Sequence, residues 1–211
     1  KTVIIESPNS QKIAEVLARG KIPFLVGGTA LYLKAVLENW GLPQVPPDLV
    51  LRHKLAGHDS AELYKELQKK DPEAANITGP YNKRRIIRAL EVIYQTARKF
   101  SEQRKKGPVL FKSLKIGLTV SKTELETRII ARTNNMINAG LIDEIRQLIK
   151  HQSWNSPVMQ SIGYHEFKDF FENKISLTKV RELIIKNTIS YTRRQMTWFK
   201  KDKAIHWVSS E

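Results

Sequence analysis

The sequence contains no cysteine, which excludes disulfide bonds, zinc sites built on thiolates and a cysteine nucleophile. Its five histidines form no HExxH-like pair of metal ligands. It also has no apolar run near the roughly 20 residues that span a bilayer, and no charged-then-apolar signal pattern at its start. We therefore expect a cytoplasmic protein that makes no membrane contact.

Acidic residues are scarce relative to basic ones. The 211 residues include 36 Lys plus Arg and 21 Asp plus Glu, which gives a formal net charge of +15 at pH 7. Residues 83–115 carry eleven basic and two acidic side chains, and residues 186–203 carry six basic and one acidic side chain. Clustered positive charge attracts polyanions and suits phosphate contacts. We therefore expect nucleic-acid binding, the alternative being an ordinary solvated surface.

Short β-branched runs and helical periodicity alternate at the start of the chain. Residues 2–5 and 24–26 fit short buried strands, and residues 11–19 between them have apolar side chains at helical spacing, closed by Gly20. Residues 115–120 and 204–208 are two further strand candidates. Strand, helix and strand in this order predict an α/β fold with a parallel sheet.

Three prolines within residues 42–48 cannot continue a helix and mark a domain boundary. Beyond them, a capping box of Asp59 and Glu62 predicts a helix through Lys70, and Asp71-Pro72-Glu73 opens the next one. Residues 81 to about 104 continue in helical pattern until Gly107-Pro108. We therefore expect an all-helical, basic insertion at residues 45–108, between two pieces of an α/β core at residues 1–44 and 109–211.

The last third of the chain also reads as helical. A capping box of Thr123 and Glu126 predicts a helix that Gly140 ends, and residues 141–151 continue as a second helix. A last long helix is expected from about residue 178 to residue 199.

The basic helix that contains residues 84–99 (RRIIRALEVIYQTARK) is amphipathic. Projection at 100° per residue separates two sets of side chains. One face carries Arg84, Arg88, Glu91, Gln95 and Arg98, and the opposite face carries Ile86, Leu90, Ile93 and Ala97. We expect the apolar face to pack and the other to offer three guanidiniums, which suit an RNA backbone. The alternative is an ordinary exposed helix face.

Two smaller features can bind anions. Gly27 and Gly28 follow the predicted strand at 24–26 and let a backbone approach a ligand closely, while Thr29 can cap the next helix or offer its hydroxyl to an anion. Arg128 and Arg132 are four residues apart on a predicted helix, so both can point towards one anionic group. The alternatives are a tight turn and two solvated charges.

Five segments resemble the tRNA dimethylallyltransferase family in order and spacing, over about residues 11–208. They are RGKIPFLVGGTALYLKAVLE (19–38), DPEAANITGPYNKRRIIRALEV (71–92), TRIIARTNNMINAGLIDEI (127–145), MQSIGYHEF (159–167) and YTRRQMTWFKK (191–201). The resemblance implies a P-loop NTPase-like parallel-sheet core with an all-helical insertion. It also implies transfer of a dimethylallyl group from dimethylallyl diphosphate to N6 of the adenosine just 3′ of the tRNA anticodon. In such an enzyme Mg²⁺ helps to stabilise the leaving diphosphate, and the target base is extruded from its stack. We expect a monomer.

The resemblance also assigns residues. It places Thr29, the candidate catalytic residue, and Arg52 at tRNA contacts. Further tRNA contacts are assigned to two stretches, which are Arg84, Arg85, Ile86, Ile87 and Arg88, and Gln160, Ser161, Ile162, Gly163, Tyr164 and His165. Arg128, Gly27 and Gly28 are assigned to the donor diphosphate. Arg84 stands where the family usually has Gln, and no metal ligand is identified.

Two family features are absent from this sequence. These are the GPTxSGKS/T phosphate loop and the Asp-Ser-x-Gln stretch whose Asp acts as general base. We expect that a segment between about Ile5 and Ser10 is missing, and that a chain truly lacking it transfers no prenyl group. The rival hypothesis is a non-catalytic RNA-binding module derived from this family, and a small-molecule kinase is a third.

Overall fold

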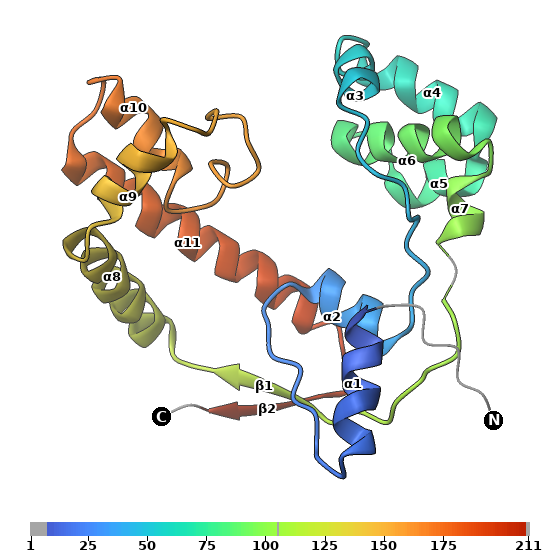
Figure 1. The fold of residues 1–211 in the computed structure, drawn as a ribbon, viewed down its shortest axis with the longest axis horizontal. Helices are drawn as coiled ribbons and strands as arrows, with labels where there is room; N and C mark the ends of the chain where they lie inside the picture. The colour runs from blue at the N-terminus through green and yellow to red at the C-terminus, as the bar shows by residue number, and fades with distance from the viewer. Residues whose placement is uncertain (1–7, 105, 210–211) are drawn as a thin grey trace. The chain divides into compact units, whose positions relative to one another are not determined.

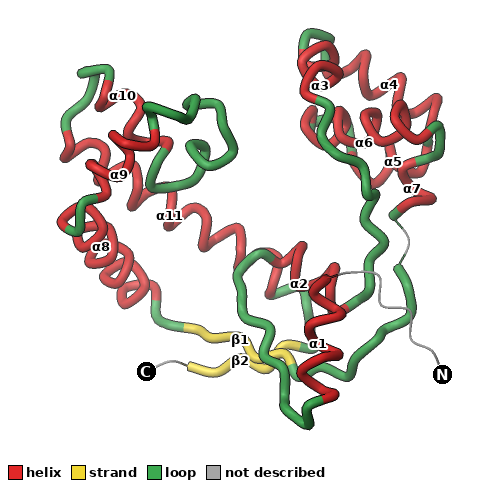
Figure 2. The backbone as a smooth tube through the Cα atoms, viewed as in Figure 1, coloured by secondary structure: helices red, strands yellow, loops and turns green. Residues whose placement is uncertain are grey.

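The computed structural model describes residues 8–104 and 106–209 of the chain. The chain divides into two compact units, Lys1–Ser113 and Leu114–Glu211. Figures 1 and 2 follow the course of the backbone through both. The expected grouping of residues 1–44 with residues 109–211 differs from this division and stays a prediction.

The first unit begins with two helices in the expected places. Helix α1 spans Pro8–Ala18 and α2 spans Ala30–Leu37. Gly20 follows α1 with a φ of +68°, a conformation that favours glycine. The strand predicted at residues 24–26 was wrong: these residues form no ladder, and Phe24 and Val26 are 87% and 89% exposed. A strand requires hydrogen bonds to a neighbour, and the run expected to pair there, residues 2–5, lies outside the described residues.

The expected all-helical segment is confirmed within the first unit. It contains α3 (Leu49–Ala56), α4 (Ser60–Lys70), α5 (Pro72–Thr78), α6 (Lys83–Thr96) and α7 (Phe100–Gln103), which Figure 1 shows as a small bundle. Its apolar core includes Leu55, Leu63, Leu67, Ile86 and Leu90, all at most 5% exposed. This core fixes the inner face of α6, so the residues on its other sides are the ones available for function.

Aspartate side chains cap α4 and α5 in this bundle. Asp59 caps α4 by accepting from the Ala61 amide at 2.8 Å. Asp71 caps α5 at Ala74, at 3.0 Å, and also accepts from the amide and hydroxyl of Ser101 at 2.8 and 2.9 Å. These bonds tie α5 to the start of α7 and satisfy a fully buried carboxylate.

The helix expected from residue 81 to about residue 104 is interrupted. Helix α6 ends at Thr96, and Ala97 has a left-handed φ of +53°, so α7 is a separate short helix. The Ala97 amide still makes the helical bond to the Ile93 carbonyl, at 2.9 Å, but the left-handed backbone at Ala97 turns the following residues out of the helix. The sequence placed Ala97 within the helix because alanine is a strong helix former.

The second unit contains both strands that the structure describes. Strands β1 (Lys115–Thr119) and β2 (Ile205–Ser209) pair in parallel, with Lys115 opposite Ile205. Between them lie α8 (Lys122–Asn138), α9 (Leu141–Leu148), the short 3₁₀ helix η1 (His165–Phe167), α10 (Lys168–Phe171) and α11 (Leu177–Phe199), as Figure 2 shows. The two predicted strands are confirmed, and the structure pairs them with each other in parallel. No helix in the described ranges is long and apolar enough to cross a membrane.

The helix starts of the second unit differ slightly from the prediction. Ser121, not Thr123, caps α8 by accepting from the Glu124 amide at 3.1 Å. Gly140 has a φ of +99° and separates α8 from α9, as expected. The apolar core between α9, η1 and α11 contains Ile145, Met159, Phe167 and Val180, all fully buried. Residues 160–165, a loop whose last residue begins η1, follow Met159 of this core.

Candidate nucleic-acid interface

The start of α6 presents basic side chains to solvent. Arg84 and Arg85 are exposed in the first turn, and the side chain of Asn82 caps the helix by accepting from the Arg85 amide at 3.2 Å. Lys83 Nζ donates to the Ala56 carbonyl at 2.8 Å and so ties α6 to the end of α3. Tyr81, just before the cap, is 98% exposed. A helix N-terminus flanked by guanidiniums is suited to a phosphate group.

Arg52 and Arg88 lie elsewhere on the bundle, at one buried carboxylate. Arg52 donates from Nε to Glu91 Oε1 at 2.8 Å and from Nη2 to Glu91 Oε2 at 2.9 Å. Arg88 Nη1 donates to the same Oε2 at 2.6 Å, and the Asp48 amide donates to Oε1 at 2.8 Å. We call these four residues the Glu91 cluster. It brings together two of the residues that the sequence assigned to tRNA contacts.

The prediction that Glu91 lies on an exposed face of α6 was wrong. Its side chain is fully buried, while those of Arg52 and Arg88 are 39% and 32% exposed. The proline-rich segment before α3 covers this side of α6: Arg88 Nη2 donates to the Val45 carbonyl at 2.9 Å and Gln95 Nε2 to the Pro46 carbonyl at 3.2 Å. The helical projection gave the direction of these side chains but not the segment that packs over them.

The charge state of Glu91 follows from its partners. Burial alone would raise the pKa of the Glu91 carboxyl, but the hydrogen bonds from Arg52 and Arg88 and from the Asp48 amide outweigh it and hold the pKa below its usual value. The carboxylate is therefore ionised at neutral pH and offsets one of the two adjacent positive charges.

Not every residue of the 84–88 stretch reaches the surface. Ile86 is fully buried and packs in the core of the bundle, and Ile87 is half-buried against the same core. Their side chains anchor the stretch, so the exposed chemistry is that of Arg84 and Arg85, with Arg88 partly accessible.

Thr29 occupies the N-cap position of α2. Its backbone is extended and its side chain makes no capping hydrogen bond. Thr29 and Gly27 are exposed, and a Cβ placed on Gly27 would meet only Leu33 Cδ2, at 3.8 Å. The local backbone at Gly27 is thus open to an approaching group, which is what a ligand contact requires.

In the second unit the loop of residues 160–165 is held from beneath by a buried glutamate. Glu166 accepts from the Gly163 amide at 2.8 Å and from Asn187 Nδ2 at 2.7 Å. Gly163 has a φ of +98°, a conformation that favours glycine. Gln160, Ser161, Ile162 and His165 are exposed around it. The loop therefore presents several side chains on a fixed backbone.

Tyr164 lies in the same loop, and its hydroxyl group is hydrogen-bonded within the second unit. Its Oη donates to Glu144 Oε1 at 2.5 Å, and this hydrogen bond, together with partial burial, raises the pKa of Tyr164. The phenol therefore stays neutral at pH 7, and Tyr164 is half-buried.

Arg128 lies in the first half of α8 and is half-exposed. Its Nε donates to Glu124 Oε1, one helical turn earlier, at 2.6 Å. Arg132 is exposed one turn further along. Such pairs at four-residue spacing are weak in water, so an anion with greater charge can displace Glu124.

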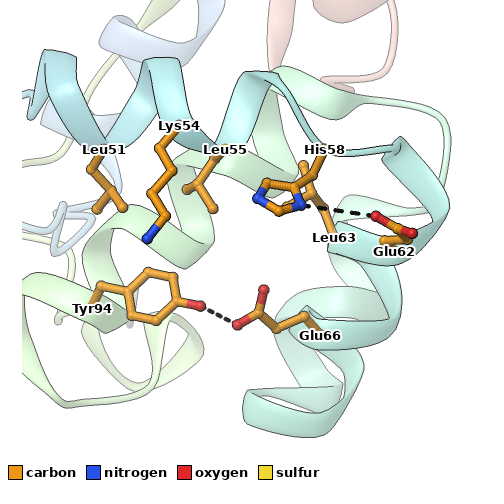
Figure 3. Close-up of a pocket in the computed structure, with 8 residues that line it drawn as sticks. All are labelled: Leu51, Lys54, Leu55, His58, Glu62, Leu63, Glu66 and Tyr94. Carbon is orange, nitrogen blue, oxygen red and sulfur yellow. Dashed lines mark hydrogen bonds and ion pairs between the residues drawn. The ribbon is translucent and has the colours of Figure 1, made fainter.

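A hollow of about 450 Å³ opens between α3, α4 and α6, and Figure 3 shows its lining. Tyr94 Oη donates there to Glu66, and burial together with this bond raises the pKa of Tyr94 to about 12. His58 lies 3.9 Å from Glu62 on the same wall. The residues assigned to function by the sequence are not in this lining, and its carboxylates do not suit a phosphate.

Metal ligands are not clustered in the part of the chain that the structure describes. Within it, no group of three or more His, Asp or Glu side chains could hold a metal ion. We therefore assign no protein ligands to the Mg²⁺ that the resemblance implies.

Sequence reasoning missed the roles of the two buried glutamates. Glu91 was recognised only as part of a polar face, and Glu166 was not singled out. A signal existed for Glu91, since it lies three residues after Arg88 on one helix face. The segments that complete each set of partners, residues 45–52 and Asn187, are too distant in sequence for any local pattern to reveal.

Similarity to known proteins extends over most of the chain. The family model described as IPP transferase matches residues 7–202. A tRNA dimethylallyltransferase of Roseiflexus sp. is 43% identical over 194 residues, covering 90% of this chain and 64% of that protein. One from Synechocystis sp. is 39% identical over 186 residues, covering 88% of this chain and 61% of that protein. The chain thus spans less than two thirds of the length of these relatives.

Two solved structures are similar to this one. The full-length tRNA isopentenylpyrophosphate transferase of Bacillus halodurans aligns with a TM-score of 0.62 at 33% identity, covering 95% of this chain and 64% of that one. The tRNA isopentenylpyrophosphate transferase of Staphylococcus epidermidis aligns with a TM-score of 0.56 at 29% identity, covering 95% of this chain and 68% of that one.

Proposed function

Because the chain belongs to the IPP transferase family, we propose that it carries the tRNA-binding part of an enzyme that prenylates tRNA. The reaction is transfer of a dimethylallyl group from dimethylallyl diphosphate to N6 of the adenosine just 3′ of the anticodon. N6 attacks C1 of the allyl group, the bond from C1 to the diphosphate oxygen breaks, and N6 loses one proton. The names of the relatives support this transferase over a non-catalytic RNA-binding module.

The observation that carries the proposal for this chain is the exposed pair Arg84 and Arg85 at the start of α6. Guanidiniums bind phosphates through paired N–H donors and stack on bases, so they suit an RNA backbone beside unpaired nucleotides. The loop of residues 160–165 adds exposed amide, hydroxyl and imidazole groups that suit the edges of anticodon bases.

In the first unit, we assign Gly27 and Gly28 to contacts with the donor diphosphate and Thr29 to the target nucleotide. In the second unit, we assign Arg128 to contacts with the donor diphosphate. A guanidinium stabilises the growing negative charge of a leaving diphosphate, and a backbone without side chains allows its oxygens to approach closely. No proton acceptor for N6 is assigned among the described residues.

We further propose that the β1–β2 sheet belongs to a P-loop NTPase-like core and that residues 45–108 are a helical insertion that contacts the anticodon arm. The enzyme acts in the cytoplasm, as a monomer. The parallel pairing of β1 and β2 and the all-helical content of α3 to α7 support this assignment.

The test is binding of a synthetic anticodon stem-loop RNA by the full chain, measured across a salt series. We expect the double variant Arg84→Ala and Arg85→Ala to weaken binding and to lower the slope of log affinity against log salt by about 0.7 for each phosphate that is no longer bound. The matched control is Lys65→Ala with Lys69→Ala, which removes two exposed charges from α4. Equal slopes for the two double variants would contradict the proposal. Incubation with tRNA and dimethylallyl diphosphate, followed by mass spectrometry of the nucleosides, tests the reaction itself.

A further inference from the structure

The Glu91 cluster is built differently from an ordinary surface ion pair. One fully buried carboxylate accepts four hydrogen bonds, from two guanidiniums and one backbone amide. Both guanidiniums bond the same oxygen, Oε2, so Arg52 and Arg88 are held next to each other despite their like charges. Replacing a buried ion pair by apolar groups is often neutral or stabilising, so stability alone does not account for this arrangement.

The two guanidiniums keep hydrogen-bond donors beyond those that bond Glu91 and Val45. Each has five N–H donors, and the bonds above, with the one from Arg88 to the Val45 carbonyl, use two on each. The side chains of Arg52 and Arg88 are 39% and 32% exposed, so part of each reaches solvent. Two guanidiniums and one carboxylate leave a net charge of +1, which matches the single negative charge of a phosphodiester.

We propose that Glu91 is a positioning residue for RNA binding, which holds Arg52 and Arg88 together as one preassembled site for a backbone phosphate. This inference rests on the proposed tRNA-binding function. Preassembly stabilises the complex because the ordering of two long side chains is completed in the free protein. The three elements that meet there are α6, the first turn of α3 and the segment of residues 45–48, whose Asp48 carboxylate caps α3 at the Leu51 amide, at 2.9 Å.

The effect of Glu91→Gln on RNA affinity separates positioning from simple charge. Removing a negative charge from a basic surface raises RNA affinity if only the total charge matters. If Glu91 positions the two arginines, the same change lowers affinity, because the amide group of glutamine turns a donor towards a guanidinium. We expect about tenfold weaker binding of the anticodon stem-loop and a salt slope lower by about 0.7 for each phosphate that is released. The matched control is Glu62→Gln, which removes the same charge from a glutamate that is 70% exposed in the same unit.

A double-mutant cycle identifies the route of the effect. In a background of Arg52→Ala and Arg88→Ala, Glu91→Gln should have no further effect on RNA affinity, because the side chains that it positions are gone. Thermal unfolding of each variant shows whether the bundle is intact. If Glu91→Gln prevents folding, Arg52→Lys decides, since it keeps the charge but loses the two-point bond to the carboxylate, and we expect binding nearly as weak as that of Arg52→Ala.

The outcomes are distinct for the two proposals. An unaltered chain that fails to bind the stem-loop rejects the proposed function itself. If the unaltered chain binds the stem-loop, and Glu91→Gln or Arg52→Lys binds as tightly and with the same salt slope, only the positioning role of Glu91 is rejected.

Discussion

Glu91 in the first unit and Glu166 in the second are both nearly fully buried, at 0% and 4% exposed, yet their partners differ in kind. Glu91 accepts from two arginine side chains and one amide, whereas Glu166 accepts from the Gly163 amide and the Asn187 side chain. A buried carboxylate requires such partners because its desolvation is costly. The first unit thus uses a glutamate to hold charged side chains, and the second uses one to hold the backbone of a loop.

Replacing Glu91 with alanine should give the largest effect. It leaves two guanidiniums and the Asp48 amide without their carboxylate, and we expect a loss of about 3 kcal/mol in the free energy of unfolding. The value is at the low end for a broken buried pair because both guanidiniums reach solvent. Urea unfolding of the full chain, with hydrogen exchange of α6 and α11 followed by mass spectrometry, measures it.

The exposed Glu62 provides the control for that change, since Glu62→Ala should cost less than about 0.5 kcal/mol. Two results would show that the Glu91 cluster does not stabilise the first unit. One is an equal loss of hydrogen-exchange protection in α6 and α11 of Glu91→Ala. The other is a loss of unfolding free energy no greater than that of Glu62→Ala.

The corresponding change in the second unit is Glu166→Gln, for which we expect a loss of about 2 kcal/mol. Glutamine keeps one acceptor oxygen but turns an amide donor towards either the Gly163 amide or Asn187 Nδ2, so one donor is left unpaired. Hydrogen exchange should increase first in residues 160–165. The control Glu182→Gln removes an exposed carboxylate paired with Lys179 on α11, and equal exchange in both variants would remove the role assigned to Glu166.

Two backbone positions sharpen the comparison further. Gly163→Ala should destabilise the chain by about 1 kcal/mol, because φ is +98° there while the added Cβ would have only an ordinary contact, with Met136 Cε at 3.5 Å. Ala97→Gly, at a φ of +53° after α6, should stabilise it by about 0.5 kcal/mol or more. Thermal unfolding measures both, and shifts of the same sign would contradict the conformational argument.

These positions also show how far the sequence predicts the structure. Helix ends at Gly20 and Gly140, the caps Asp59 and Asp71 and the strands β1 and β2 follow from local patterns, and they are confirmed. The break at Ala97 is not readable because alanine favours helices, and the strand expected at residues 24–26 fails because pairing depends on a distant partner.

The candidate site divides in the same way. The helical projection places Arg84 on the polar face of α6, and the structure exposes it. The burial of Glu91 arises from residues 45–52, about 40 positions away, and a helical projection carries no information on such contacts.

The smallest expected effect is the pH dependence of hydrogen-exchange protection in α6. The pKa of Glu91 is held below its usual value of 4.5, against the opposing effect of burial, by its arginine partners. A carboxyl whose pKa is lower in the folded than in the unfolded protein stabilises the folded state at pH values above its unfolded pKa. This stabilisation is lost as the pH falls through the pKa of the folded protein. Protection of α6 should therefore be unchanged from about pH 7 to about pH 5.5 and should fall below pH 4.5. Glu91→Ala should show a weaker pH dependence, and an unaltered dependence would contradict this assignment.

The central proposal is that this chain binds the anticodon arm of tRNA through its basic surfaces. The most direct measurement is a salt titration of RNA binding by the full chain, with an anticodon stem-loop compared with a hairpin of the same stem and an unrelated loop. We predict tighter binding of the anticodon stem-loop, with an affinity that falls as salt rises. Equal affinity for the two hairpins, or no binding at low salt, would contradict the claim.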